Sequence, residues 1–196
     1  HGEAVVQPLW APDGTLLFVS DRDNWWNLYR CSGGQIEQFT ALEAEFGTPP
    51  WVFGMQQYAC PSPSRILCAF TRRGTWTLAG LDVGSRRLTP FDLPFTDIGS
   101  VQSDDSQAVF LGGSSREPLS VIRLDLHSGE RAVLRQSAHL AIDPEYLSAP
   151  EAIEFPTAGG QTAHGLFYSP RNPGYRAPDA ERPPLVVMIH GGPTSM

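Results

Sequence analysis

Residues 10–40, WAPDGTLLFVSDRDNWWNLYRCSGGQIEQFT, contain the pattern that decides the fold. Turn residues at Trp10–Gly14 precede the apolar run Leu16–Ser20, which predicts a β-strand. A second strand is predicted over Trp26–Arg30 and a third over Gln35–Thr40, with a turn that contains two glycines between them. Short strands joined by tight turns predict an antiparallel sheet.

The same order of strands recurs twice along the chain. The second unit contains Arg65–Phe70, Trp76–Leu81 and Arg86–Thr89, and the third contains Ala108–Leu111, Ser120–Leu126 and Arg131–Leu134. Phe18, Phe70 and Phe110 occupy equivalent positions in the three units, at spacings of 52 and 40 residues. These spacings are close to the roughly 40–50 residues of a four-stranded propeller blade. Because a closed propeller needs at least about four blades, the repeats predict a partial β-propeller whose other blades lie upstream.

The composition excludes several classes of function. The 196 residues carry a net charge of −7, which argues against nucleic acid as the main partner because phosphate binding requires a basic surface. All 14 basic residues are arginine, so no lysine Schiff-base chemistry can take place in this segment. No apolar run is long enough to predict a membrane span.

The three cysteines, Cys31, Cys60 and Cys68, lack Cys-x-x-Cys spacing. They are interpreted as buried free thiols in a reducing compartment, which favours a cytoplasmic location. His127, His139 and His164 are scattered without the spacing of metal ligands, so no metal site is expected, and no cofactor is expected either.

The pattern changes after the third repeat. Two strands are predicted over Ala152–Thr157 and Ala163–Pro170, followed by a proline-rich loop. The continuous apolar run Leu185–Ile189 is typical of a strand buried on both faces. A hairpin, a long loop and a buried strand are one way in which an α/β-hydrolase domain begins. The chain is therefore divided into the C-terminal part of a propeller domain (1–145) and the start of an α/β-hydrolase domain (146–196).

The last predicted strand leads directly into His190-Gly191-Gly192-Pro193. In α/β-hydrolases a glycine-rich loop after the third strand directs a backbone N–H at the oxyanion that forms during acyl transfer. Glycines suit this position because the backbone must approach the substrate closely. The end of the chain therefore indicates an oxyanion loop.

Four stretches resemble the prolyl oligopeptidase family of serine peptidases, on its dipeptidyl-aminopeptidase and acylaminoacyl-peptidase side. They are PLWAPDGTLLFVSDRDNWWNLYR (8–30), EAEFGTPPWVFG (43–54), YLSAPEAIEFPTAGGQTAHGLFYSP (146–170) and PPLVVMIHGGPTS (183–195). Members of that family carry a β-propeller that caps an α/β-hydrolase domain, and the resemblance implies the same layout here.

The resemblance also implies the roles of the terminal residues. It places Gly192, the second glycine after the histidine, in the oxyanion loop, with Gly191 and His190 as supports of that loop. In the family the catalytic Ser, Asp and His follow later in the chain, and no Gly-x-Ser-x-Gly occurs in this segment. The segment alone is therefore expected to be catalytically incomplete.

Four residues of the first repeat region are candidate substrate contacts: Trp25, Trp26, Glu43 and Glu45. A partly desolvated carboxylate can hold the ammonium of a peptide, and a tryptophan can line a substrate cavity. The alternative interpretations are a solvated loop for the glutamates and blade core for the tryptophans. Arg22 and Arg30 are expected to form structural pairs with these acids or to meet a substrate carboxylate.

Together these features predict a segment of a serine exopeptidase or oligopeptidase that cleaves short peptides through an acyl-enzyme. Its expected partners are short peptides, the rest of the hydrolase domain and the missing blades, and a homo-oligomer is left open. Two alternatives stay open as well. The repeats alone allow a non-catalytic propeller that serves as a binding module, and the oxyanion loop is shared with carboxylesterases.

Overall fold

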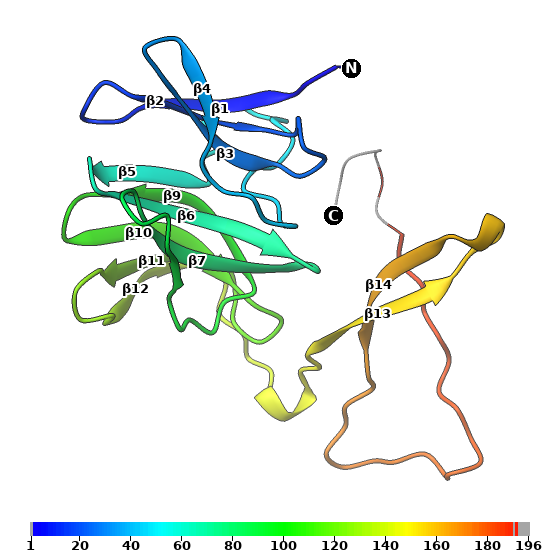
Figure 1. The fold of residues 1–196 in the computed structure, drawn as a ribbon. Helices are drawn as coiled ribbons and strands as arrows, with labels where there is room; N and C mark the ends of the chain where they lie inside the picture. The colour runs from blue at the N-terminus through cyan, green and yellow to red at the C-terminus, as the bar shows by residue number, and fades with distance from the viewer. Residues whose placement is uncertain (1, 190, 192–196) are drawn as a thin grey trace.

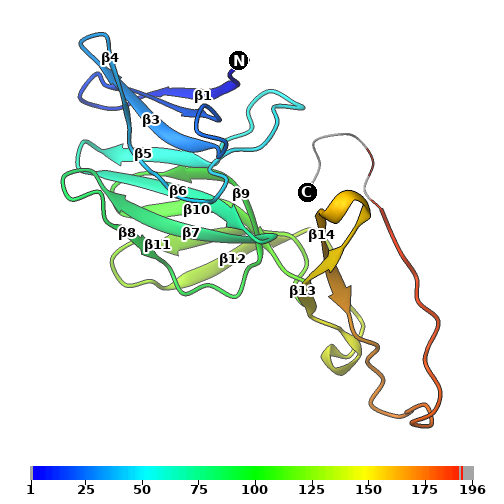
Figure 2. The same ribbon diagram turned by 45° about the vertical axis from the view of Figure 1, so that its right-hand side comes forward.

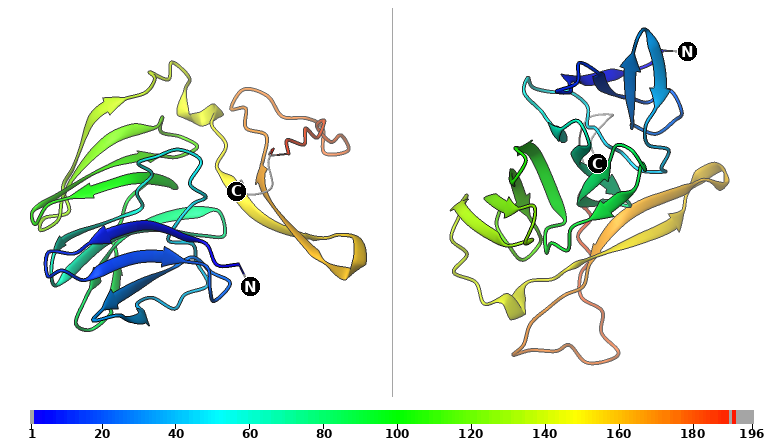
Figure 3. Two further views of the ribbon diagram at one scale, coloured as in Figure 1. Left: turned by 90° about the horizontal axis from the view of Figure 1, so that it is seen from above. Right: turned by 60° about the vertical axis from the view of Figure 1, so that its left-hand side comes forward.

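The computed structural model describes residues 2–189 and 191. Up to residue 136 the chain forms three antiparallel sheets of four strands each, and in every sheet the strands follow one another in chain order (Figures 1 and 2). The sheets lie side by side in Figure 3, as the blades of a propeller do. The prediction of a partial β-propeller is therefore confirmed.

Each blade contains the four strands of the predicted propeller blade, of which the sequence located three. The first blade consists of β1 (Val5–Trp10), β2 (Leu16–Ser20), β3 (Asn27–Ser32) and β4 (Gln35–Gln38). The second consists of β5 (Tyr58–Ser62), β6 (Arg65–Arg72), β7 (Thr75–Asp82) and β8 (Leu88–Pro90). The third consists of β9 (Asp97–Ser103), β10 (Gln107–Gly113), β11 (Ser120–Asp125) and β12 (Arg131–Gln136). The predicted strands correspond to the second, third and fourth strand of each blade.

The first strand of each blade is interrupted by a β-bulge, which explains why the sequence did not predict it. The pairing of β1 shifts opposite Phe18, and Gln7 in the bulge has a φ of 52°. The pairing of β9 shifts opposite Phe110, where Ser100 has a φ of 53°, and β5 contains a similar shift. An extra residue breaks the alternation of apolar and polar side chains by which a strand is recognised.

The predicted equivalence of the three phenylalanines holds only in part. Phe18 and Phe110 both face a bulge, whereas Phe70 lies beyond the residues of β6 that pair with β5. Phe70 packs instead against Phe46, with the ring centroids 5.1 Å apart.

Several predicted strand boundaries differ from the structure, two of them at the start of a strand in the blades. The strand β3 begins at Asn27, so Trp26 precedes it. The strand β8 begins at Leu88, because Arg86 belongs to the preceding hairpin turn, where it has a φ of 58° and its N–H donates to the carbonyl of Asp82 (2.8 Å).

Two clusters of buried side chains fill the spaces between adjacent blades. The cluster between the first and second blades includes Leu17, Val19, Leu28, Phe46, Tyr58, Ile66, Cys68 and Leu81. The cluster between the second and third blades includes Leu67, Ala69, Leu78, Ile98, Phe110, Ile122 and Leu124. The second blade thus contributes one face to each cluster.

Hydrogen bonds also link the first strands of adjacent blades. The backbone N–H of Gln57 donates to Oε1 of Gln7 (2.7 Å), and the Tyr58 hydroxyl donates to the Gln7 carbonyl. The backbone N–H of Val101 donates to the carbonyl of Gln56 (2.9 Å), which connects the third blade to the second. Burial raises the pKa of Tyr58, so its hydroxyl keeps the proton that it donates.

After the blades the chain forms a hairpin of β13 (Pro150–Pro156) and β14 (Thr162–Tyr168), which matches the two strands predicted there. The 3₁₀ turns η1 (Pro144–Tyr146) and η2 (Ala158–Gly160) are the helical segments among the described residues, and neither is long and apolar enough to cross a membrane. The division at residue 146 falls between β12 and β13 and stays a prediction.

The strand predicted over Leu185–Ile189 is not formed. These five side chains are 70–92% exposed, and the segment pairs with no other strand among the described residues. A buried strand requires neighbours that supply hydrogen bonds and cover both faces, and the described part of the chain supplies neither at this position.

The cysteines differ in burial. Cys68 is buried, whereas Cys31 and Cys60 are half-buried, and all three are free thiols. The interpretation of buried thiols is therefore right for Cys68 alone. Burial raises the pKa of Cys60 to about 11 and that of Cys68 to about 12.

These raised pKa values predict slow alkylation of two thiols. At pH 8 only about 0.1% of a thiol with a pKa near 11 is ionised, and the thiolate is the reactive form. Peptide mapping after a short exposure to iodoacetamide at pH 8 should find Cys60 and Cys68 almost unmodified, while in urea all three cysteines react. Equal rates in folded and unfolded protein at either position would contradict the expectation.

Candidate functional site

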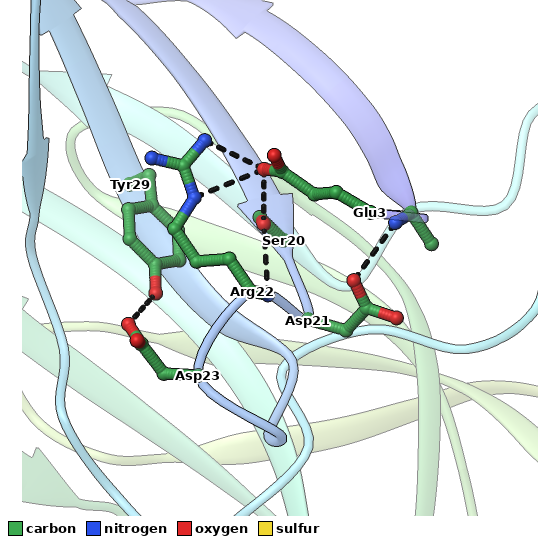
Figure 4. Close-up of polar contacts among 7 residues, drawn as sticks. Glu3, Ser20, Asp21, Arg22, Asp23 and Tyr29 are labelled. Atoms are coloured by element: carbon green, nitrogen blue, oxygen red, sulfur yellow. Dashed lines mark hydrogen bonds and ion pairs between the residues drawn. The ribbon is translucent and has the colours of Figure 1, made fainter. Parts of the chain in front are cut away.

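The side chains of the motif Ser20-Asp21-Arg22-Asp23 anchor the edge of the first blade (Figure 4). Nε and Nη2 of Arg22 donate to Oε1 of Glu3 (2.9 and 2.6 Å), and Oγ of Ser20 donates to the same oxygen (2.6 Å). These bonds from Ser20 and Arg22 lower the pKa of Glu3. Oδ1 of Asp21 accepts from the N–H of Ala4 (2.8 Å). The motif therefore holds the N-terminal segment against β2.

The aromatic ring of Tyr29 supports the same corner. The Arg22 guanidinium lies 4.8 Å from the ring centroid, and the hydroxyl donates to Oδ2 of Asp23. Burial, followed by the hydrogen bond to Asp23, raises the pKa of Tyr29. The polar side chains of Ser20-Asp21-Arg22-Asp23 thus make structural contacts within the first blade.

Arg30 is also a structural residue. It forms an ion pair with Glu37 (2.7 Å) and lies 5.3 Å from the ring centroid of Phe39. Arg86 of the second blade pairs with the same Glu37, and its guanidinium lies 5.5 Å from the centroid of the same Phe39 ring. Arg22 and Arg30 therefore form structural pairs as expected, but with Glu3 and Glu37 rather than with Glu43 or Glu45.

Glu45 is held in place by backbone contacts on two sides. Its own N–H and carbonyl exchange hydrogen bonds with Thr71 of β6, both at 2.9 Å. Its side-chain Oε2 accepts from the backbone N–H of Trp26 (2.7 Å). The sequence placed Glu45 and Trp26 among the candidates separately, and the structure brings them together.

The carboxylate of Glu45 is half-buried and lacks a cationic partner. None of the described residues forms an ion pair with it, and its Oε1 accepts no hydrogen bond from them. Burial raises its pKa, the hydrogen bond from Trp26 opposes that change, and the charge of Asp21 reinforces it. A half-buried carboxylate in a negative environment is a favourable place for a cation.

The two tryptophans have different environments. Trp26 packs against the cluster between the first two blades, where a Cβ at Gly47 would lie only 2.5 Å from its ring. Only glycine therefore fits beside this ring without displacing it. Trp25 is 38% exposed, and Glu43 is exposed and forms no side-chain hydrogen bond or ion pair with the described residues. Trp26 thus belongs to the blade core.

The loop between β4 and β5 carries three further side chains that the sequence reasoning missed. Trp51 and Val52 are 66% and 67% exposed, and Phe53 is fully exposed. The loop projects on the side of the blades where the β13–β14 hairpin lies (Figures 1 and 2). Three consecutive apolar residues between Pro50 and Gly54 were the available signal, because turn residues on both sides make a core strand improbable there.

The terminal loop is described only at Gly191, which is exposed. His190 and Gly192 lie outside the described residues, so the oxyanion role of Gly192 and the supporting roles of Gly191 and His190 stay predictions. Within residues 2–189 and 191, no group of three or more His, Cys, Asp or Glu side chains is arranged to hold a metal ion.

Comparisons with known proteins place the chain among peptidases. The sequence matches no protein-family model, and it matches no curated protein. The structure matches that of puromycin hydrolase with a TM-score of 0.83 and 31% identity, over 93% of this chain and 28% of that chain. It matches a Mycobacterium tuberculosis puromycin-hydrolyzing peptidase with a TM-score of 0.86 and 29% identity, over the same shares of both chains.

More distant neighbours have the same fold. A structure of prolyl endopeptidases matches with a TM-score of 0.61 and 9% identity, over 84% of this chain and 24% of that chain. The chain thus spans little more than a quarter of the length of the first relatives, and the likeness covers both the blades and the hairpin. These neighbours confirm the resemblance found in the four sequence stretches: the chain is similar in structure to puromycin hydrolases and to prolyl oligopeptidases.

Proposed function

We propose that the complete protein is a serine peptidase that cleaves short peptides from their free amino end through an acyl-enzyme. Its peptidase neighbours support the general class, and the stretch PPLVVMIHGGPTS supports the finer one because it resembles an oxyanion loop. One neighbour, a puromycin hydrolase, was crystallised as a serine-to-alanine mutant complexed with PGG. By analogy, we propose that this protein uses a serine nucleophile and binds a ligand of the size of a short peptide.

The observation that carries the proposal is the unpaired carboxylate of Glu45. The amino end of a peptide is an ammonium group near neutral pH, and it needs a partly desolvated anion to bind tightly. Glu45 supplies such an anion, since Trp26 fixes one oxygen and leaves the other without a partner among the described residues. We assign Glu45 to the substrate ammonium, with Glu43 as a weaker second anion and Trp25 as a contact at the edge of the site.

The remaining parts are assigned from the family resemblance. The N–H of Gly192 stabilises the oxyanion, Gly191 and His190 hold its loop, and the serine, aspartate and histidine come from the rest of the hydrolase domain. The missing propeller blades complete a cap that admits short peptides. A cytoplasmic location and a homo-oligomer belong to the same proposal.

Replacing Glu45 by glutamine should lower kcat/KM about 10- to 100-fold for a peptide with a free amino end, because a partly buried charge pair is lost. The same peptide with an acetylated amino end should show no such loss. Glu43→Gln serves as the matched control, and its exposed side chain predicts a change below about threefold. Steady-state kinetics of the complete protein with both peptides measures these effects.

The pH profile gives an independent readout. Because the pKa of Glu45 is raised, its carboxylate gains a proton as the pH falls through that value, and kcat/KM for the free peptide should fall with it. Glu45→Gln should lack this acidic limb.

An equal loss of kcat/KM in Glu45→Gln with the free and the acetylated peptide would contradict the proposal. Hydrolysis of ester substrates but not of amide substrates would indicate a carboxylesterase. Peptide binding without turnover would indicate a binding module.

A further inference from the structure

A groove with both charged and apolar side chains lies between the second and third blades. It has a volume of about 790 Å³ and is lined by residues of both blades. It is formed by the ends of β5 and β7, the start of β6, the strand β8 with its flanking residues, the β9–β10 turn and the residues that follow β11. The ends of β5, β7 and β11 lie on the side of the blades away from the β13–β14 hairpin (Figures 1 and 2). Both blades are complete within the described residues, so the groove does not depend on a missing blade.

Arg65 lines this groove without a counter-ion. It is half-buried at the start of β6 and stands directly opposite Asp82 of β7. The two form no ion pair, and Oδ1 of Asp82 accepts hydrogen bonds from the N–H (2.7 Å) and Oγ (2.6 Å) of Ser85 instead. These bonds lower the pKa of Asp82 and keep its charge on the hairpin turn. Among the described residues, no acceptor bonds the Arg65 guanidinium.

Other side chains of the groove extend this pattern. The Arg87 guanidinium also forms no ion pair or hydrogen bond with the described residues, and the carboxylate of Asp105 is equally unpaired. The two arginines and two aspartates of the lining sum to zero charge. A multiply charged anion such as phosphate would gain nothing from this balance, whereas a ligand with one positive and one negative end would satisfy both signs.

We propose that the groove binds a short peptide with both ends free, its carboxylate on Arg65 and Arg87 and its ammonium on Asp105. Pro61 and Phe91 supply apolar contacts to the peptide between its charged ends. Arginine suits the carboxylate because its planar guanidinium can donate two parallel hydrogen bonds, and the half-burial of Arg65 strengthens those it would donate. The inference does not rest on the proposed function, because no residue of the ammonium site at Glu45 takes part.

The test is a titration of the ¹⁵N-labelled chain with trialanine, followed by NMR. Amide signals of groove residues such as Ser64, Gly80 and His127 should shift and saturate at millimolar peptide. Arg65→Gln should weaken binding about tenfold, and so should a C-terminal amide on the peptide, because each removes one partner of the charged pair. The matched control is Arg116→Gln, an exposed arginine outside the groove, which should leave binding unchanged.

Three results would overturn the proposal. The first is the absence of saturable shifts at the groove in wild-type chain whose spectrum shows it to be folded. The second is equally strong binding of the peptide amide, or of inorganic phosphate, at the groove. The third is binding that Glu45→Gln abolishes and Arg65→Gln spares, since the peptide would then occupy the ammonium site. Unchanged groove binding in Glu45→Gln supports the groove, whatever the outcome for the ammonium site.

Discussion

A proline in place of Gly192 is expected to lower kcat of the complete peptidase about 10²- to 10³-fold, the loss found when one oxyanion donor is removed. Proline has no backbone N–H, so the donor assigned to this position disappears. The expectation depends on the family resemblance of the stretch IHGGPTS and on the proposed acyl-enzyme mechanism. Single-turnover kinetics with a peptide substrate would separate the loss of the chemical step from a change in binding.

The matched variant is Gly192→Ala. Alanine keeps the N–H and adds only a methyl group, so it should retain far more activity than proline at the same position. Circular dichroism and the unfolding midpoint of both variants would show whether the fold is kept. If proline and alanine reduced kcat equally, the backbone N–H would not be the group that matters. A kcat for Gly192→Pro close to that of the wild type would exclude this residue from the oxyanion hole.

Truncation of Phe110 to alanine is expected to lower the free energy of unfolding by about 3–5 kcal/mol, which is the usual cost of truncating a buried phenylalanine. Phe110 is 1% exposed, lies opposite the bulge of β9 and packs edge-on against Phe95, with ring centroids 6.0 Å apart. It belongs to the cluster between the second and third blades, so its removal leaves a cavity at a joint between two sheets. Urea unfolding followed by tryptophan fluorescence measures the change.

Phe53→Ala is the control for this experiment. Phe53 is fully exposed in the loop between β4 and β5, so the same truncation removes no buried contact. Its expected effect on the free energy of unfolding is within about 0.5 kcal/mol. A similar loss in both variants would contradict the position of Phe110 in the core.

Local patterns predicted the repeating part of the fold because most blade strands are regular. Strands β2, β3, β6, β7, β10 and β11 follow the pairing that their turns and apolar residues predict. The first strands could not be found in this way, since the bulges at Gln7 and Ser100 disturb the alternation of side chains. The strand predicted over Leu185–Ile189 is wrong for the opposite reason. Its apolar pattern is clear, but the neighbouring strands that it needs are not among the described residues.

The candidate site shows the same limit of local reasoning. Composition could identify Glu43 and Glu45 as acids near two tryptophans, but it could not tell which one is desolvated. The backbone of Glu45 is fixed by Thr71, which is 26 residues further along the chain, and no local pattern predicts that contact. Likewise, the sequence suggested a structural pair for Arg22, but it could not identify Glu3 as the partner, which the contact between the two residues shows.

Each of the two buried clusters lies between a pair of adjacent blades. The second blade contributes to both clusters, so the three described blades form a series in which it is the middle member. In such a nearest-neighbour arrangement, stability is a sum of the stabilities of the units and of their interfaces, as in one-dimensional repeat proteins. Loss of an outer blade removes one interface, whereas loss of the second removes both. Among the described blades, cooperative unfolding is therefore transmitted through β5–β8, and within this segment the first and third blades are coupled through that middle blade.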